Sequence, residues 1–219
     1  MLRFCAVALL FCAFAAKSAD VAVRVVNKAL PSEIAPDLQT LFQSQAVQVV
    51  AGDKTVLELW LAKEVPLQSK PTSTVKALDA VKPVSLLAAV AVPSARRDYR
   101  DDEVPAGTYT MRFALQQQDG NHSGSSEFGY FGVLVPAKLD TKPDGIKDYK
   151  ELMKASSKET STDHPMVLSL RPVASTEGAP LTLNTPAPEH KSVRVKVPAK
   201  GPDTKEIAFE IVFEGKGHK

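Results

Sequence analysis

Two short stretches of the sequence carry the residue types that bind metal ions or move protons. QDGNHSG, residues 118–124, contains Asp119 and His122, and a later DHP contains Asp163 and His164. Carboxylate oxygens and imidazole nitrogens together hold divalent metal ions without any thiolate. If the two stretches meet in space, they predict a divalent-metal site. The chain would then be a metal-binding protein or a metal-dependent exported enzyme that uses Asp119, His122 and His164.

The same residues have a simpler interpretation as turn chemistry. Asp and Asn side chains bond to their own backbone, so the Asp-Gly-Asn run before His122 is typical of a loop between two strands. His122 is then an exposed side chain, and Asp163 forms a turn or a cap before a proline. One distance separates the two interpretations, because an ion with bonds near 2 Å needs the rings of His122 and His164 within about 4 to 5 Å of each other.

Aromatic side chains give a third hypothesis. Trp60 and Tyr130 are the candidates for stacking on sugar rings, which would make the chain a carbohydrate-binding module. Large aromatic residues also fill the cores of β-sandwiches. Trp60 lies between Leu59 and Leu61, and this favours a buried strand. Both interpretations stay open.

Short apolar runs between turn-forming clusters predict the elements that position these residues. This spacing is typical of an antiparallel β-sandwich, immunoglobulin-like or jelly-roll-like, whose loops gather at the two ends. A shared site requires the loop carrying His122 and the segment carrying His164 to lie at the same end. The expected strands cover residues 21–26, 46–50, 56–61, 84–92, 108–115, 128–135, 166–170, 181–183, 192–197 and 206–213.

The clearest strand signal lies at residues 108–115. Tyr109, Met111 and Phe113 share one face of this strand, and Arg112 lies on the other face. A change of period then predicts one amphipathic helix between residues 144 and 159, with Asp144 as its N-cap. A second, short helix is expected over residues 36–44. These elements predict one mainly β domain.

The start of the chain has the order of a secretory signal peptide. One arginine precedes a short apolar run that ends at small residues, which predicts a signal over residues 1–18 and cleavage after Ser18. The mature domain, residues 19–219, then carries 25 basic and 25 acidic residues and lacks both cysteines, Cys5 and Cys12. No later stretch reaches the roughly 20 apolar residues of a membrane span. We expect a soluble, periplasmic or secreted protein that needs no disulfide.

Charge and motifs exclude several functional classes. The basic residues are spread along the chain and show no cluster typical of nucleic-acid binding. The sequence contains no G-x-S-x-G, H-E-x-x-H or G-x-G-x-x-G motif and no phosphate-binding loop. The mixed run at residues 96–103 balances its own charges and predicts a solvated loop.

Several longer stretches resemble one known family. They are LPSEIAPDLQTLFQSQAVQVV, VLELWLAKEVP, DYRDDEVPAGTYTMRFALQQQDGNHSG and HPMVLSLRP, in this order. Together they are similar to a family of exported bacterial proteins with a PGxYTLRY-like strand, a following DGxHxG loop and a later His-Pro. Met111 and Phe113 stand where that family commonly has Leu and Tyr. The resemblance implies export and a β fold, and it implies no particular activity.

The leading functional hypothesis from the sequence is a non-catalytic binding or structural accessory of the cell envelope. Its partner would be an envelope protein or a glycan. The metal-dependent and carbohydrate-binding hypotheses remain as alternatives.

Overall fold

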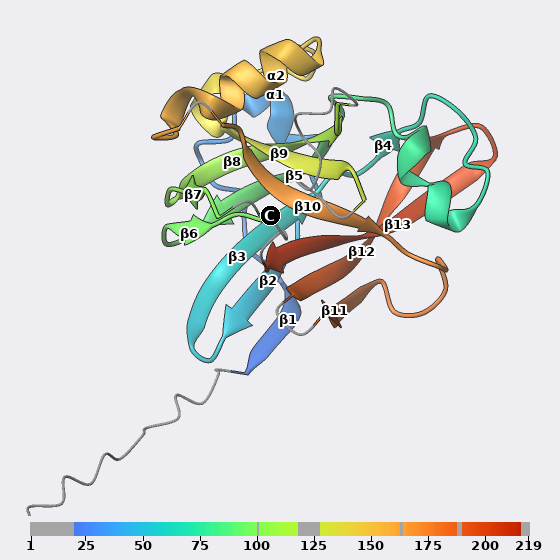
Figure 1. Cartoon of the computed structure of the whole chain (residues 1–219), viewed down its shortest axis with the longest axis horizontal. Helices are drawn as coiled ribbons and strands as arrows, with labels where there is room; N and C mark the ends of the chain where they lie inside the picture. The colour runs from blue at the N-terminus through green and yellow to red at the C-terminus, as the bar shows by residue number, and fades with distance from the viewer. Residues whose placement is uncertain (1–19, 100, 118–127, 163, 188–189, 216–219) are drawn as a thin grey trace, which may run out of the picture.

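The computed structural model describes residues 20–99, 101–117, 128–162, 164–187 and 190–215. One large sheet dominates it (Figure 1), and this confirms the prediction of a mainly β, antiparallel fold. The short strand β4 (Val65–Pro66) pairs with the sheet in parallel, and β6 (Arg96–Arg97) and β7 (Glu103–Val104) form a separate hairpin. The other strands are β1 (Val21–Val26), β2 (Ala46–Ala51), β3 (Lys54–Leu61), β5 (Leu86–Val92), β8 (Gly107–Leu115), β9 (Tyr130–Pro136), β10 (Met166–Pro172), β11 (Leu181–Ala187), β12 (His190–Gly201) and β13 (Thr204–Glu214).

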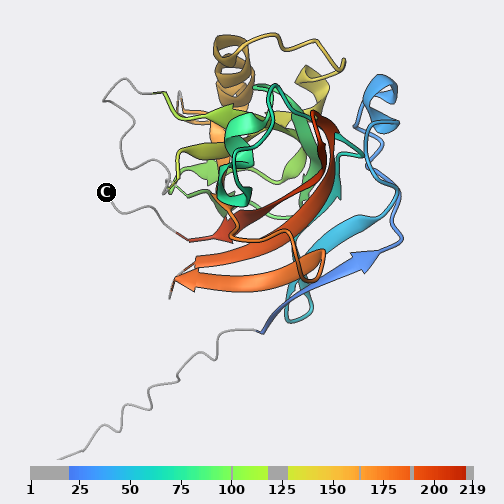
Figure 2. The ribbon, with the colours of Figure 1, turned by 90° about the vertical axis from the view of Figure 1, so that its right-hand side faces the viewer.

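The sheet curls until its two edges meet. Its strand order is β1-β2-β3-β5-β8-β9-β10-β13-β12-β11. β10 pairs with β9 through residues 166–170 and with β13 through residues 170–172, so the sheet turns a corner along this strand. The edge strands β1 and β11 contact each other (Figures 1 and 2). One face of the sheet therefore lies inside the curl and the other lies outside.

The inner face holds the main hydrophobic core. The alternation predicted for β8 is confirmed, because Tyr109, Met111 and Phe113 are buried in this core while Arg112 lies on the outer face. Gly132 of β9 pairs with Phe113, and a Cβ atom at this glycine would collide with the Met111 thioether. Glycine is needed here because the side chains of the neighbouring strand occupy the space.

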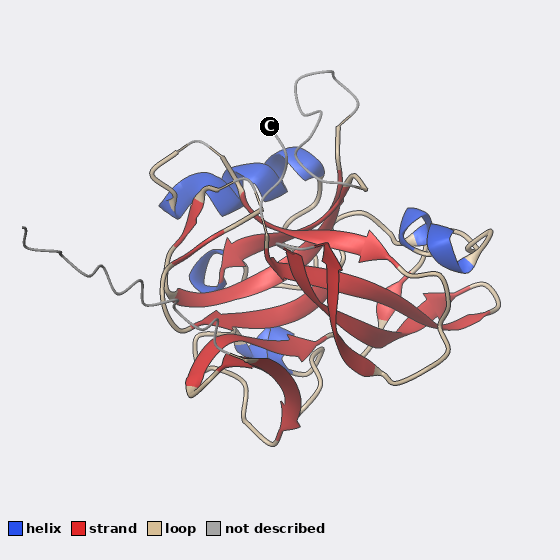
Figure 3. Ribbon diagram, turned by 60° about the horizontal axis from the view of Figure 1, so that its bottom comes forward, coloured by secondary structure: helices blue, strands red, loops and turns tan. Residues whose placement is uncertain are grey.

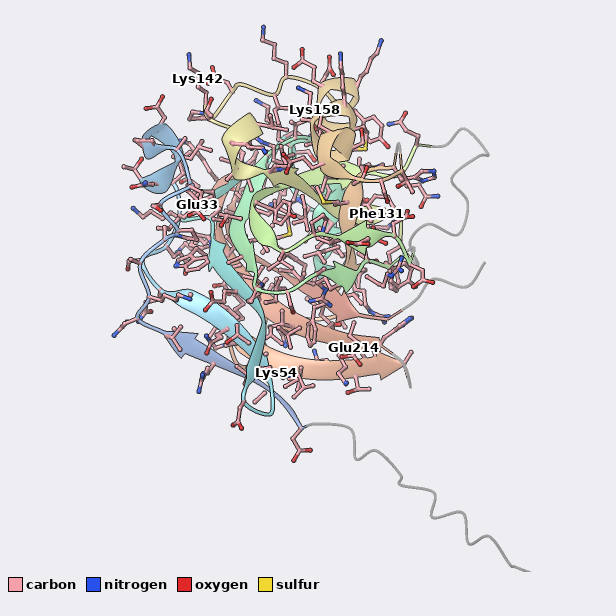
Figure 4. All side chains as sticks on the ribbon, turned by 90° about the vertical axis from the view of Figure 1, so that its left-hand side faces the viewer. Glu33, Lys54, Phe131, Lys142, Lys158 and Glu214 are labelled. Carbon is pink, nitrogen blue, oxygen red and sulfur yellow. The ribbon has the colours of Figure 1, made fainter. Side chains whose placement is uncertain are left out.

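Two helical segments cover parts of the outer face (Figure 3). α2 (Tyr149–Ser156) continues into the 3-10 turn η4 (Ser157–Glu159), and its Leu152 packs in one cluster with Phe131, which Figure 4 labels below the helix. α1 (Pro36–Gln39) brings Leu38 into a cluster with Trp60. The remaining 3-10 turns are η1 (Thr74–Lys76), η2 (Leu78–Ala80) and η3 (Ala137–Leu139).

The amphipathic helix starts later than predicted. Its N-cap is Asp148, whose Oδ1 accepts a 2.9 Å hydrogen bond from the Glu151 N–H. Asp144 is not the cap, because the N–H of Gly145 closes a turn onto the Lys142 carbonyl at 3.1 Å. This turn carries residues 142–147 across the outer face of β8.

The second helix and strand β5 are shorter than predicted. α1 ends at Gln39, although Phe42 beyond it is also buried, and β5 begins at Leu86 instead of residue 84. Val84 and Ser85, which were predicted to begin this strand, belong to a turn instead. In the described part of the chain, no helix has the length and apolar character to span a bilayer.

Candidate functional site

The Arg112 side chain lies on the outer face of β8 and is only 2% exposed. It forms a bidentate pair with Asp140, from Nε to Oδ2 at 2.7 Å and from Nη2 to Oδ1 at 2.8 Å. Thr110, on the same face of β8, donates to Asp140 Oδ2 at 2.5 Å. Both buried charges are therefore paired and hydrogen-bonded, as a stable buried ion pair requires. The guanidinium also donates to three backbone carbonyls, those of Val84, Lys142 and Pro143.

These carbonyls belong to two segments that are far apart in the sequence. Residues 82–86 lead into β5, and residues 140–147 lead from η3 towards α2. Arg112 bonds both segments at once, because a guanidinium presents five N–H donors in one rigid plane. The buried pair thus fixes how the two segments face each other.

The segment before β5 contains an unusual turn. Residues 82–85 close a turn with Pro83 in its second position and Val84 in its third. Val84 has φ +66°, which is the sign that a type II turn requires and that a β-branched residue rarely adopts. Two hydrogen bonds hold it there, because its N–H donates to the Phe113 carbonyl and its own carbonyl accepts from Arg112.

We expect the strain at Val84 to reverse the usual order of alanine and glycine. In extended or helical backbone, glycine is less stable than alanine by roughly 0.5–1 kcal/mol. At φ +66° an alanine costs roughly 1–2 kcal/mol, so V84G should unfold at higher urea concentration than V84A. At the control position Thr182, in β11, T182A should be more stable than T182G. The same order at both sites would contradict the strain.

A cavity of about 720 Å³ opens where these segments meet. It lies between the chain after α1, the segment from β3 to β4, the turn before β5 and residues 143–147. Its volume falls in the range of about 300–1,000 Å³ that is usual for small-molecule sites. The lining residues are of two kinds. The apolar ones are Leu41, Ala62, Pro66, Pro83, Val84, Leu86, Pro143 and Ile146, and the polar ones are Thr40, Lys63, Glu64, Lys82, Ser85, Arg112, Asp144 and Lys147.

The charges around this cavity are unequal. Arg112 is neutralised by Asp140, and Glu64 forms an ion pair with Lys200 at 3.4 Å. The lysines Lys63, Lys82 and Lys147 are exposed and have no ion-pair partner within the part of the chain that the structure describes. Among the lining residues, only the carboxylate of Asp144 is left to oppose these three, so the lining carries excess positive charge. Just outside it, the Glu151 carboxylate accepts from the Lys147 N–H at 2.9 Å.

The predicted metal residues are only partly placed. Asp119, His122 and Asp163 lie outside the described residues, so the distance between His122 and His164 stays untested. The His164 side chain is half exposed, with Nδ1 3.9 Å from Asp102 Oδ2. Within the described ranges, His, Cys, Asp and Glu residues nowhere gather in a group of three suited to a metal ion. The metal site therefore stays a prediction.

The two candidate sugar-stacking residues are both buried. Trp60 is fully buried, and its indole N–H donates to the Lys28 carbonyl at 2.9 Å. Tyr130 stacks on Phe113 in the main core and donates to Asp79 Oδ1 at 2.5 Å. Burial, followed by this hydrogen bond, raises the pKa of Tyr130 to about 12. Neither ring presents an open face to solvent on which a sugar could stack. Carbohydrate binding therefore stays a prediction.

In the charged run at residues 96–103, the described residues, 96–99 and 101–103, are more enclosed than those of a solvated loop. Its ends pair as β6 and β7, and Asp98 is buried, with Oδ1 accepting from the Asp102 N–H at 3.0 Å. Burial lowers the pKa of Arg96, whereas Glu214 and Asp98 oppose that shift. The prediction failed because a balanced charge count does not reveal which side chains the neighbouring strands enclose.

The sequence held few signs of the cavity. The Lys-Pro-Val-Ser stretch contains a proline suited to the second position of a turn, but its valine favours a strand. The three lysines come from separate segments, so only the fold brings them together. Lys-Pro before an apolar run was the one local sign of the turn.

These features define a mainly β protein with a cavity on the outer face of its curled sheet. The chain matches no protein-family model, no curated protein and no solved structure.

Proposed function

We propose that this chain is an exported, non-catalytic binding protein of the cell envelope, and that it holds a small ligand in the cavity beside Arg112. The observation that carries the proposal is the cavity itself, which has the volume of a ligand site and a mixed apolar and charged lining. The Arg112–Asp140 pair supports it, because the pair fixes two of the cavity walls in place before any ligand arrives. Walls that are already fixed lose less conformational entropy when a ligand binds, and this favours affinity.

Export rests on the sequence of the first 18 residues, and we propose a soluble mature chain in the periplasm or outside the cell. We further propose that the chain is related to the exported bacterial family that it resembles. N-terminal sequencing of protein recovered from the periplasm or the medium tests the proposal of export. The expected first residue is Ala19, and an intact Met1 in all recovered protein would contradict it.

We also propose that the curled sheet has the architecture of a β-sandwich. One layer would run from β1 to β9 and the other from β13 to β11, with β10 passing between them. The main core then lies between the layers, and the cavity lies outside them. The exposed lining positions, such as Thr40, lie away from the core, so they can be altered without unfolding the chain.

A neutral apolar dye tests the cavity. We expect N-phenyl-naphthylamine to bind the purified protein with a rise in fluorescence. T40W fills the cavity from an exposed lining position and should lower the affinity at least about tenfold, or about 1.4 kcal/mol. K54W is the matched control, because Lys54 is exposed at the far end of the molecule from Lys142 (Figure 4). No dye binding, or equal loss in both variants, would contradict the proposal.

A further inference from the structure

We propose that the ligand of this cavity is a small amphipathic anion, a single apolar body with one carboxylate or similar acidic head. This inference rests on the proposed binding function and adds the chemical class of the ligand. It follows from the difference in burial between most of the apolar lining residues and the three lysines.

The buried and half-buried apolar residues of the cavity form its inner wall, whereas Pro83 and Pro143 are exposed. Val84 and Ile146 are almost fully buried, and they belong to the cluster beneath α2. Leu86 and Pro66 are half buried and line the same space. A ligand here replaces water against apolar side chains, which is favourable at roughly 25 cal/mol for each Å² of apolar surface buried. The inner part of the site therefore selects an apolar body.

Arg112, the charged residue of the inner wall, is already occupied. Arg112 is bonded to Asp140 and to three carbonyls, so its charge is compensated within the protein. A buried group that is already paired offers little to an anionic head. The head must therefore find its charge partners elsewhere in the lining.

The mouth supplies those partners. Lys63 follows β3, Lys82 is the first residue of the Val84 turn, and Lys147 lies just before α2. All three are exposed, and the carboxylate of Glu64 is paired with Lys200. The excess of lysines over Asp144 in the lining favours an acidic head at the rim. Each ammonium there stays hydrated, so its contribution to the binding free energy is modest and depends on salt. The geometry thus orients the ligand, apolar end inward and acidic end outward.

Calorimetric titration with three ligands of the same chain length tests this orientation. Decanoate, decanol and decyltrimethylammonium share one apolar chain and differ in the charge of the head. We expect decanoate to bind most tightly and decyltrimethylammonium least tightly. Added salt should weaken decanoate binding and leave decanol binding unchanged, because only the charged head is screened.

Substitution of the lysines identifies their role. K63Q, K82Q and K147Q should each lower decanoate affinity about two- to fivefold, and the triple variant should lower it further. Decanol affinity should stay constant in all of them. K54Q makes the same charge change far from the cavity and should leave decanoate affinity unaltered.

The outcomes separate this inference from the proposed function. If the dye and decanol bind but decanoate has no advantage, or if K54Q acts like the rim variants, the anion inference fails and the cavity function stands. If neither the dye nor any of the three ligands binds, both fail. Co-sedimentation with phosphatidylglycerol vesicles without decanoate binding would overturn the inference in favour of a membrane surface.

Discussion

R112M is expected to destabilise the protein by about 3–5 kcal/mol, the usual cost of leaving a buried charge without its partner. Among the side chains that the structure describes, only Thr110 would still donate to the Asp140 carboxylate, although that carboxylate is almost fully buried. D140N should cost a comparable amount, because it leaves the Arg112 guanidinium buried without a counter-charge. Urea unfolding monitored by circular dichroism measures both effects.

The double variant R112M/D140N separates the ion pair from ordinary packing. Each single substitution leaves one buried charge without its partner, whereas the double variant contains neither charge. We therefore expect the double variant to lose about 1–3 kcal/mol less than the sum of the singles, within the usual range for residues in direct contact. Additive losses, or single losses below about 1 kcal/mol, would show that the pair does not fix this part of the fold.

This pair also links stability to ligand binding. Arg112 holds the Val84 carbonyl on one wall of the cavity and the Pro143 carbonyl on another. A variant that still folds without the pair should bind the neutral dye more weakly, although the methionine adds apolar surface. The walls would then have to be ordered at the moment of binding, which costs affinity.

The strands were predictable because their inward positions alternate with a period of two. β1 was predicted with its observed bounds, and the β2–β3 turn carries Gly52 at φ +57°, as the glycine indicated. On β8 the sequence identified the two faces correctly. It did not reveal that Arg112 would be buried, because the covering residues, 140–147, are about 30 positions away.

The candidate site was much harder to predict than the strands. Sequence reasoning selected histidines and acids in loops, where turn chemistry and metal chemistry use the same residue types. The cavity instead uses prolines, lysines and a strained valine, none of which is distinctive alone. Their functional meaning depends on the curl of the sheet and on the Arg112 contacts, and these long-range features leave no local pattern.

W60A is expected to destabilise the protein by about 3–5 kcal/mol, since this substitution removes a large side chain from a packed core. Trp60 is fully buried beside Leu38 and Phe42, and its N–H bonds the Lys28 carbonyl. W60F should cost less, because it keeps an aromatic ring and loses chiefly that hydrogen bond. Urea unfolding compares the two variants.

The same substitution distinguishes a core residue from a sugar-binding platform. A residue that serves only as an exposed platform changes stability by about 0.5 kcal/mol or less when it is replaced. Phe128 is the control, since it is 39% exposed and lies against the Arg171 guanidinium, a contact worth roughly 0.5–1 kcal/mol at an exposed site. F128A should therefore cost about 1 kcal/mol or less. The contrary result is that W60A lowers the free energy of unfolding as little as F128A and also abolishes binding on a glycan array. That result would contradict the core role, because Trp60 would then have to be accessible through opening of the cluster beneath α1.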